Sequence, residues 1–193
     1  MAILPRLVFG YNELMSPAKE KILLLLFAGL SLGFSYLPRQ QIRILKGVSR
    51  EWKWIDEKAL REKVRELYRS KLVEKKENPD GSQTLILSEK GKLKALTYRF
   101  KEMKIKKENW DGKWRVVIFD IPERLRCGRD ILRDKLKVLG FYELQKSVLV
   151  FPYECKNEIE FIVEFFGLKP YVRLGILEAI DNELHLKKNF NLI

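Results

Sequence analysis

Residues 114–123, WRVVIFDIPE, constrain the fold of this chain more than any other stretch. Residues 116–119 form a short apolar run of β-branched and aromatic side chains, and the run ends abruptly at Asp120. Such a run predicts a strand that is buried on both faces. Asp120 and Glu123 have the spacing of a capping box at the start of a helix. We therefore expect a core strand with one carboxylate at its C-terminal end.

The residues after this strand predict a small domain of mixed helices and strands. Apolar residues between Leu125 and Leu139 recur at steps of three and four, which predicts a helix packed on a sheet, and Gly140 supplies its C-terminal stop. The order strand, helix, strand, helix, strand is typical of a ferredoxin-like sandwich. The later elements are expected as a strand at 142–153, a helix at 159–166, and strands at 172–180 and 184–192.

Two motifs of this region resemble a known family. The segments WDGKWRVVIFDIPE at 110–123 and LGFYELQKSVLVFPY at 139–153 resemble the central domain of phenylacetic-acid-degradation repressors, the PaaX-type regulators. That domain is similar to the small ferredoxin-like endonuclease of CRISPR spacer acquisition. Asp120 matches the strand-end aspartate of that endonuclease. The second-strand signature of the family is matched by Gln145, Ser147 and Val148.

The first half of the chain predicts a winged helix-turn-helix. Ser16 and Pro17 supply a cap and a first-turn proline for one helix, and Asp56 caps a later one. The tetrapeptide NPDG at 78–81 is a strong turn signal between two short strands. The expected order is helices at 17–32, 38–45 and 57–71, strands at 72–77 and 83–87, and a last helix at 88–100.

Nearly all of the net positive charge lies in this first half. Residues 1–110 carry 24 Lys or Arg against 13 Asp or Glu, whereas residues 111–193 carry 14 against 13. An excess on one half points to an anionic partner held by that half, either nucleic acid or a membrane surface. The apolar run at 22–34 is only 13 residues long and is interrupted by two glycines. A bilayer-spanning helix needs about 20 apolar residues, so we expect a buried core helix and no membrane partner.

The third predicted helix, 57–71, carries the expected binding chemistry. One side is apolar and would pack on the first two helices; the other carries cations at steps of three, four and four, as a recognition helix in a major groove requires. Lysines of the following hairpin would hold flanking phosphates. The inner side comprises Leu60, Val64, Leu67 and Lys71, and the predicted DNA-binding residues are Lys58, Arg61, Arg65, Arg69, Lys75 and Lys76.

A solvated helix face is the alternative interpretation of these charges, because Glu57, Glu62 and Glu66 lie close enough in sequence for local ion pairs. A second basic stripe recurs in the helix after Asp120. There we favour a face paired with Asp130 and Asp134, since that half of the chain is nearly neutral. The second stripe comprises Arg126, Arg129, Arg133 and Lys137.

Asp120 also has two interpretations. As a cap, its carboxylate satisfies free amides at the start of the next helix, which is the interpretation that we favour. Under the endonuclease resemblance, a dimer would bring two such aspartates together to hold Mg²⁺ and activate water. The sequence has no glycine-rich phosphate loop and one histidine, His185, so we predict no catalytic residues and no cofactor. The two cysteines form no CxxC pair and nothing resembles a secretory leader, which favours the cytoplasm.

The sequence therefore predicts an α+β protein with a winged helix-turn-helix domain at 1–100, a basic linker at 101–112 and a ferredoxin-like dimerisation domain at 113–193. The usual C-terminal helical domain of PaaX-type regulators has no counterpart in these residues, so no effector is carried over from the resemblance. The expected function is a homodimeric, sequence-specific repressor that binds double-stranded DNA. The alternative is a CRISPR spacer-acquisition protein, either a Mg²⁺-dependent endonuclease or a scaffold that holds DNA beside an integrase.

Overall fold

A computed structural model describes residues 15–28, 32–36, 42–44 and 56–192. These residues belong to two compact units, which divide between Glu102 and Met103. Both units combine helices with a four-stranded antiparallel sheet, so the α+β class predicted from the sequence is confirmed. No helix in the described part of the chain has the length and apolar character to cross a bilayer.

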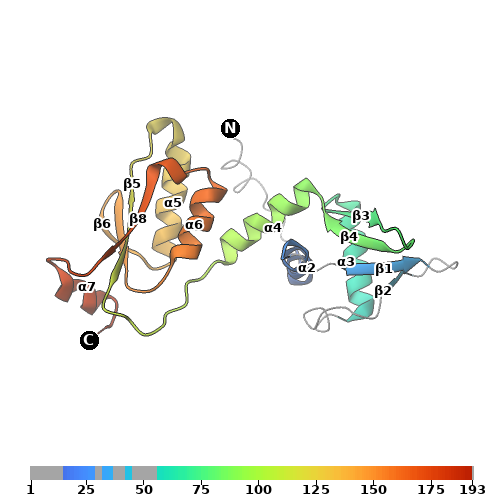
Figure 1. Ribbon diagram of the computed structural model, residues 1–193, viewed down its shortest axis with the longest axis horizontal. Helices are drawn as coiled ribbons and strands as arrows, with labels where there is room; N and C mark the ends of the chain where they lie inside the picture. The colour runs from blue at the N-terminus through green and yellow to red at the C-terminus, as the bar shows by residue number, and fades with distance from the viewer. Residues whose placement is uncertain (1–14, 29–31, 37–41, 45–55, 193) are drawn as a thin grey trace. The chain divides into compact units, whose positions relative to one another are not determined.

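The first unit contains a sheet in the order β2-β1-β4-β3, and all of its strands pair antiparallel. Its core lies between α2, α3, α4 and the β3-β4 hairpin, where Ile22, Leu67 and Ala95 are fully buried. In chain order the elements are α2 (Pro17–Phe27), β1 (Leu32–Tyr36), β2 (Ile42–Ile44), α3 (Glu57–Arg69), β3 (Val73–Glu77), β4 (Gln83–Leu87) and α4 (Glu89–Glu102) (Figure 1).

Two of the helices predicted for this unit are wrong in part. The first helix ends at Phe27, and Leu32–Tyr36 instead forms β1, which pairs with β4 through Leu32 and Leu85. A short apolar run fits a buried strand as well as a buried helix, and here pairing with β4 decides. The second predicted helix is also replaced, since Ile42–Ile44 is strand β2. The rest of that prediction, 38–41 and 45, falls outside the described residues.

The second unit has the element order of a ferredoxin-like fold. Its sheet runs β6-β7-β5-β8, with β5 in the middle and antiparallel to both neighbours. The elements are β5 (Trp114–Phe119), the 3₁₀ turn η2 (Glu123–Leu125), α5 (Arg126–Val138), β6 (Tyr142–Gln145), β7 (Val148–Phe151), α6 (Lys156–Phe165), the 3₁₀ turn η3 (Lys169–Tyr171), β8 (Val172–Leu177) and α7 (Glu183–Asn189).

The two faces of β5 are covered by different elements. Helices α5 and α6 lie together on one side of the sheet (Figure 1). Val117 and Phe119 are buried and, because side chains of a strand alternate, point to the opposite face from Trp114. Trp114 packs with Val150 and with Leu186 of α7. The strand predicted at 184–192 is therefore wrong. Leu184 and Leu186 are two residues apart, a spacing that is typical of one face of a strand. The residues instead form a helix, in which Glu183 and Lys187 make an i,i+4 ion pair.

The segment predicted as one strand at 142–153 is a hairpin. It turns at residues 146 and 147, so β6 and β7 pair with each other. The family signature lies at this turn: Gln145 ends β6, Val148 begins β7, and the carbonyl of Ser147 accepts a hydrogen bond from the Phe119 amide at 3.0 Å. The signature therefore lies beside the C-terminal end of β5, and Asp120 is the residue that follows this end.

Candidate nucleic-acid interface

Helix α3 is strongly amphipathic and begins where the sequence predicted. The carboxylate of Asp56 accepts a hydrogen bond from the Ala59 amide at 3.1 Å, which caps the first turn. Leu60, Val64 and Leu67 are buried against α2 and the hairpin. Lys71, predicted on this inner side, is exposed instead, because the helix ends at Arg69 and Lys71 turns the chain with a φ of 56°.

The predicted basic stripe lies on the outer side of α3. Lys58, Arg65 and Arg69 are exposed, and Arg61 is half-buried at the edge of the core. At 100° per residue, Arg61 and Tyr68 fall on the side of the helix next to the hairpin, and Glu66 falls on the side next to α2. The helix therefore places Arg61 and Glu66 on different sides.

The contacts of Glu66 bear on the solvated-face alternative. Its carboxylate pairs with Lys63 at 2.8 Å and with Lys19 of α2. Hydrogen bonds from Lys19 and Lys63 hold the pKa of Glu66 below its ordinary value. Among the residues that the structure describes, no ion pair joins Arg65 or Arg69 to a carboxylate. These two guanidinium groups consequently remain available at the surface.

The hairpin lysines point to opposite faces of β3. Lys75 is paired across the hairpin with the buried Leu85, whereas Lys76 is paired with Thr84. Because successive side chains of a strand alternate, Lys75 lies on the α3 side and Lys76 on the other. The Nζ atom of Lys75 lies 5.1 Å from the ring centroid of Tyr68, whose side chain is 49 % exposed.

Tyr68 was not among the residues predicted to bind DNA. Its signal in the sequence is weak: it follows Arg61 by seven residues, or two turns, and so lies on the same side of α3. The contact with Lys75 depends on how the hairpin folds back on the helix, which sequence spacing does not give.

A buried hydroxyl joins α3 to the helix that follows the hairpin. Ser88 Oγ donates to the Lys71 carbonyl at 2.7 Å and accepts from the Gly91 amide at 3.0 Å. The Ser88 amide also donates to the Leu72 carbonyl at 3.1 Å. Ser88 therefore links the residues after α3 to the first turn of α4.

The second basic stripe, on α5, is paired within the protein. Asp130 lies 3.5 to 3.9 Å from guanidinium nitrogens of Arg126, Arg129 and Arg133, and Glu123 lies 3.1 Å from Arg129. Lys137 pairs with Glu143 of β6. The paired-face prediction is confirmed for Asp130. The other predicted partner, Asp134, forms no ion pair with these cations in the described part of the chain.

Asp120 is exposed at the end of β5, and the cap predicted for it is wrong. Pro122 precedes η2 and Leu125 precedes α5, and neither helix start is capped by a side chain. Ile121 and Pro122 extend the chain beyond the strand, so the helix begins too late for the Asp120 carboxylate to cap it. The Asp120 amide donates to the Tyr171 carbonyl at 2.9 Å. Within the described residues, no group of three His, Cys, Asp or Glu side chains is placed to hold a metal ion.

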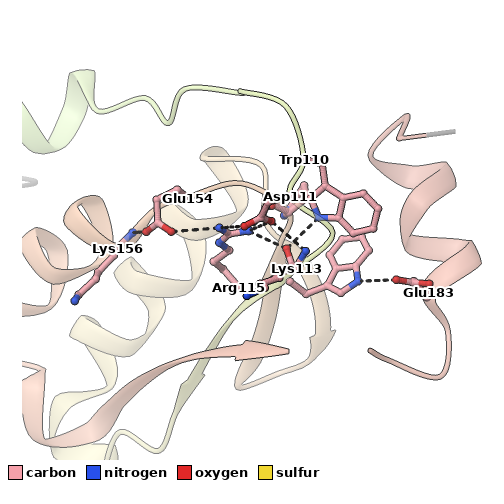
Figure 2. A network of polar contacts seen from close by, with 9 residues as sticks. Trp110, Asp111, Lys113, Arg115, Glu154, Lys156 and Glu183 are labelled. Atoms are coloured by element: carbon pink, nitrogen blue, oxygen red, sulfur yellow. Dashed lines mark hydrogen bonds and ion pairs between the residues drawn. The ribbon is translucent and has the colours of Figure 1, made fainter. Parts of the chain in front are cut away.

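A network of polar contacts in the second unit surrounds Arg115 (Figure 2). Its side chain is only 9 % exposed, and two of its nitrogens donate to both oxygens of Asp111, at 2.6 and 2.8 Å. It also donates to the carbonyls of Lys113 and Pro152 and to Glu154. These bonds lower the pKa of Asp111 to about 2. The network fixes the chain before β5 onto the domain.

Comparison with known proteins identifies this second unit. Residues 107–187 match the family model described as the PaaX protein central Cas2-like domain. A search of curated proteins found no match for the chain. The match to residues 107–187 confirms the resemblance to PaaX-type proteins that the two motifs predicted.

Proposed function

We propose that this protein is a dimeric, sequence-specific regulator of transcription that binds double-stranded DNA through its first unit and pairs two chains through its second. The observation that carries the proposal is the outer side of α3, where Arg65 and Arg69 are exposed and paired with no carboxylate of the described residues. Arginine in a major groove can donate two hydrogen bonds to O6 and N7 of guanine.

The arrangement of the first unit supports a winged-helix interpretation. The apolar side of α3 packs on α2, and the β3-β4 hairpin follows α3 directly, as a wing follows a recognition helix. Strand β1 pairs with β4 of that hairpin and so extends it into a sheet. The family of the second unit is consistent with this function, because PaaX-type proteins are regulators.

A groove on the second unit supports the proposed dimer. Strand β8 is at one end of the sheet, and a groove of about 470 Å³ runs between it and α6. The side chain of Ile176 in this groove is largely exposed, and the rim carries the ion pairs Lys156 with Glu160 and Lys169 with Glu164. A second chain related by a two-fold axis carries the same lysines and glutamates along its own groove. Its cations can therefore face the carboxylates of this rim, so a second chain is a suitable occupant of the groove. Ile176→Glu is expected to convert the dimer to monomer in analytical ultracentrifugation.

Selection of genomic DNA fragments by the purified protein tests the DNA-binding function. The wild-type protein should retain a small set of fragments that share an inverted repeat, since a two-fold dimer reads two half-sites. Arg65→Ala/Arg69→Ala should lose this enrichment, whereas Arg126→Ala, in the paired stripe of α5, should keep it. Equal retention of all fragments by the wild-type protein would contradict sequence-specific recognition.

A second candidate function rests on Asp120. Its carboxylate is exposed at the end of β5 and caps neither following helix, so it remains available for other chemistry. In a Mg²⁺-dependent endonuclease of spacer acquisition, two such carboxylates from a dimer would hold the ion. This candidate predicts DNA cleavage that requires Mg²⁺ and is lost in Asp120→Asn. Uncleaved DNA after incubation of wild-type protein with Mg²⁺ counts against it.

A further inference from the structure

Tyr68 interrupts the basic side of α3 with a large aromatic ring. The ring is 49 % exposed, and the ammonium group of Lys75 lies 5.1 Å from its centroid. The negative face of an aromatic ring attracts a cation at this distance. Tyr68 and Lys75 come from different elements, so their contact joins the end of α3 to the first strand of the hairpin.

Only one of the two hairpin lysines, Lys75, is placed to make this contact. Lys75 is on the side of β3 that faces α3, and Lys76 is on the opposite side, paired with Thr84. A flexible lysine side chain loses rotamer freedom when it binds a phosphate. A ring that already holds Lys75 beside α3 reduces this loss, and Lys75 itself is an exposed residue.

Given the DNA-binding function proposed above, we propose that Tyr68 is a positioning residue that holds Lys75 beside α3, so that this ammonium group and the arginines of α3 contact the same stretch of DNA backbone. Lys75, and not Lys76, is then the hairpin lysine that acts together with the helix. The pair serves affinity and orientation and does not read the base sequence, because its partner is a phosphate.

Salt dependence of binding gives a direct measure of this contact. Each phosphate neutralised by a cation contributes about 0.9 to the slope of log affinity against log salt concentration. Lys75→Ala should therefore lower the slope by about 0.9 on a short random-sequence DNA duplex. Tyr68→Leu should weaken binding about two- to fivefold, the range expected for an exposed cation–π contact. Tyr68→Phe keeps the ring and should retain wild-type affinity.

Two comparisons separate positioning from a merely structural role. Tyr68→Leu should weaken binding in the wild-type background but not in Lys75→Ala, because the ring then has no cation to hold. Lys76→Ala is the matched control from the opposite face of β3, and its slope should stay close to that of the wild-type protein. Equal effects of Tyr68→Leu in the two backgrounds, or a slope change in Lys76→Ala as large as in Lys75→Ala, would overturn the inference.

The same titrations distinguish failure of this inference from failure of the proposed function. Absence of duplex binding by the wild-type protein at low salt would contradict both. Binding that falls in Arg65→Ala but is unchanged in Tyr68→Leu and Lys75→Ala would contradict the role of the pair alone. Circular dichroism of Tyr68→Leu, together with recovery of affinity in Tyr68→Phe, excludes misfolding as the cause of a loss.

Discussion

Arg115 holds Asp111 by two hydrogen bonds, from separate guanidinium nitrogens to separate carboxylate oxygens, at 2.6 and 2.8 Å. Paired bonds of this kind between ionised groups are among the strongest in proteins. Arg115 is the second residue of β5, and Asp111 precedes the strand. The pair, with Glu154, therefore fixes the point at which the chain enters the central sheet of the second unit (Figure 2).

We expect the stability contributed by Asp111 to depend on pH. Its pKa falls from 3.8 to about 2 on folding because Arg115 bonds the ionised form. The contribution is therefore complete above about pH 4 and is lost as the pH falls through about 2. Asp111→Asn should unfold at lower urea concentration than the wild-type protein at pH 7, and the difference should shrink towards pH 2. Tryptophan fluorescence reports the transition, since Trp110 and Trp114 lie beside the pair.

Gly91, in the first turn of α4, should tolerate no side chain. A Cβ atom there would lie 1.9 Å from the Leu72 carbonyl oxygen, a backbone atom that cannot move without disturbing the hairpin. Gly91→Ala should lower the free energy of unfolding by about 2 kcal/mol or more, as overpacking does. Gly81→Asn is the control: its site has open space, and asparagine tolerates the φ of 76°. Comparable losses in the two variants in urea titrations would contradict the steric account.

Removal of the Ser88 hydroxyl should also destabilise the first unit. Ser88→Ala leaves the Gly91 amide without its acceptor and the Lys71 carbonyl without this donor, in a buried site. The expected cost is about 1 to 3 kcal/mol in the free energy of unfolding. Ser70→Ala removes an exposed hydroxyl that donates to the Glu66 carbonyl, and it should cost less than about 0.5 kcal/mol. Thermal unfolding of the two variants side by side measures the difference.

The two cysteines should differ in reactivity. Cys155 is fully buried, and burial raises the pKa of its thiol to about 12, so the reactive thiolate is not populated near neutral pH. Cys127 is exposed on α5. A maleimide reagent should label one thiol per chain in the native protein and two in guanidinium chloride. Cys127→Ser should be unlabelled before denaturation, and native labelling of that variant would contradict the burial of Cys155.

Helix α5 and strand β5 were predictable from the sequence, whereas the elements formed by the apolar segments at 22–34 and 184–192 were not. The apolar spacing of α5 and the β-branched run of β5 correspond to the elements observed. At 22–34, one apolar run divides into the end of α2 and the strand β1, and only pairing with β4 distinguishes them. The segment at 184–192 failed for the same reason, because burial of Leu186 against Trp114 stabilises a helix whose leucines imitate a strand.

Only the part of the candidate interface that lies on a single element, helix α3, was predictable from the sequence. The stripe on α3 follows from helical geometry, so Lys58, Arg65 and Arg69 were assigned correctly to the exposed side. Lys75 and Lys76 were both predicted to hold phosphates, and that prediction did not consider that successive side chains of a strand point to opposite faces. Tyr68 was missed because its significance comes from a second element, the hairpin, folding beside the helix.

The hydroxyl of Ser88 joins two helices of the first unit. The same oxygen bonds the residue that turns the chain out of α3 and the first turn of α4, and α4 runs without interruption to Glu102, where the first unit ends. One side chain therefore ties the residues that follow α3 to the start of α4, and we expect the two helices to change position together. The carboxyl end of α3, the helix that we propose reads DNA, is therefore held by α4 as well as by its own apolar side.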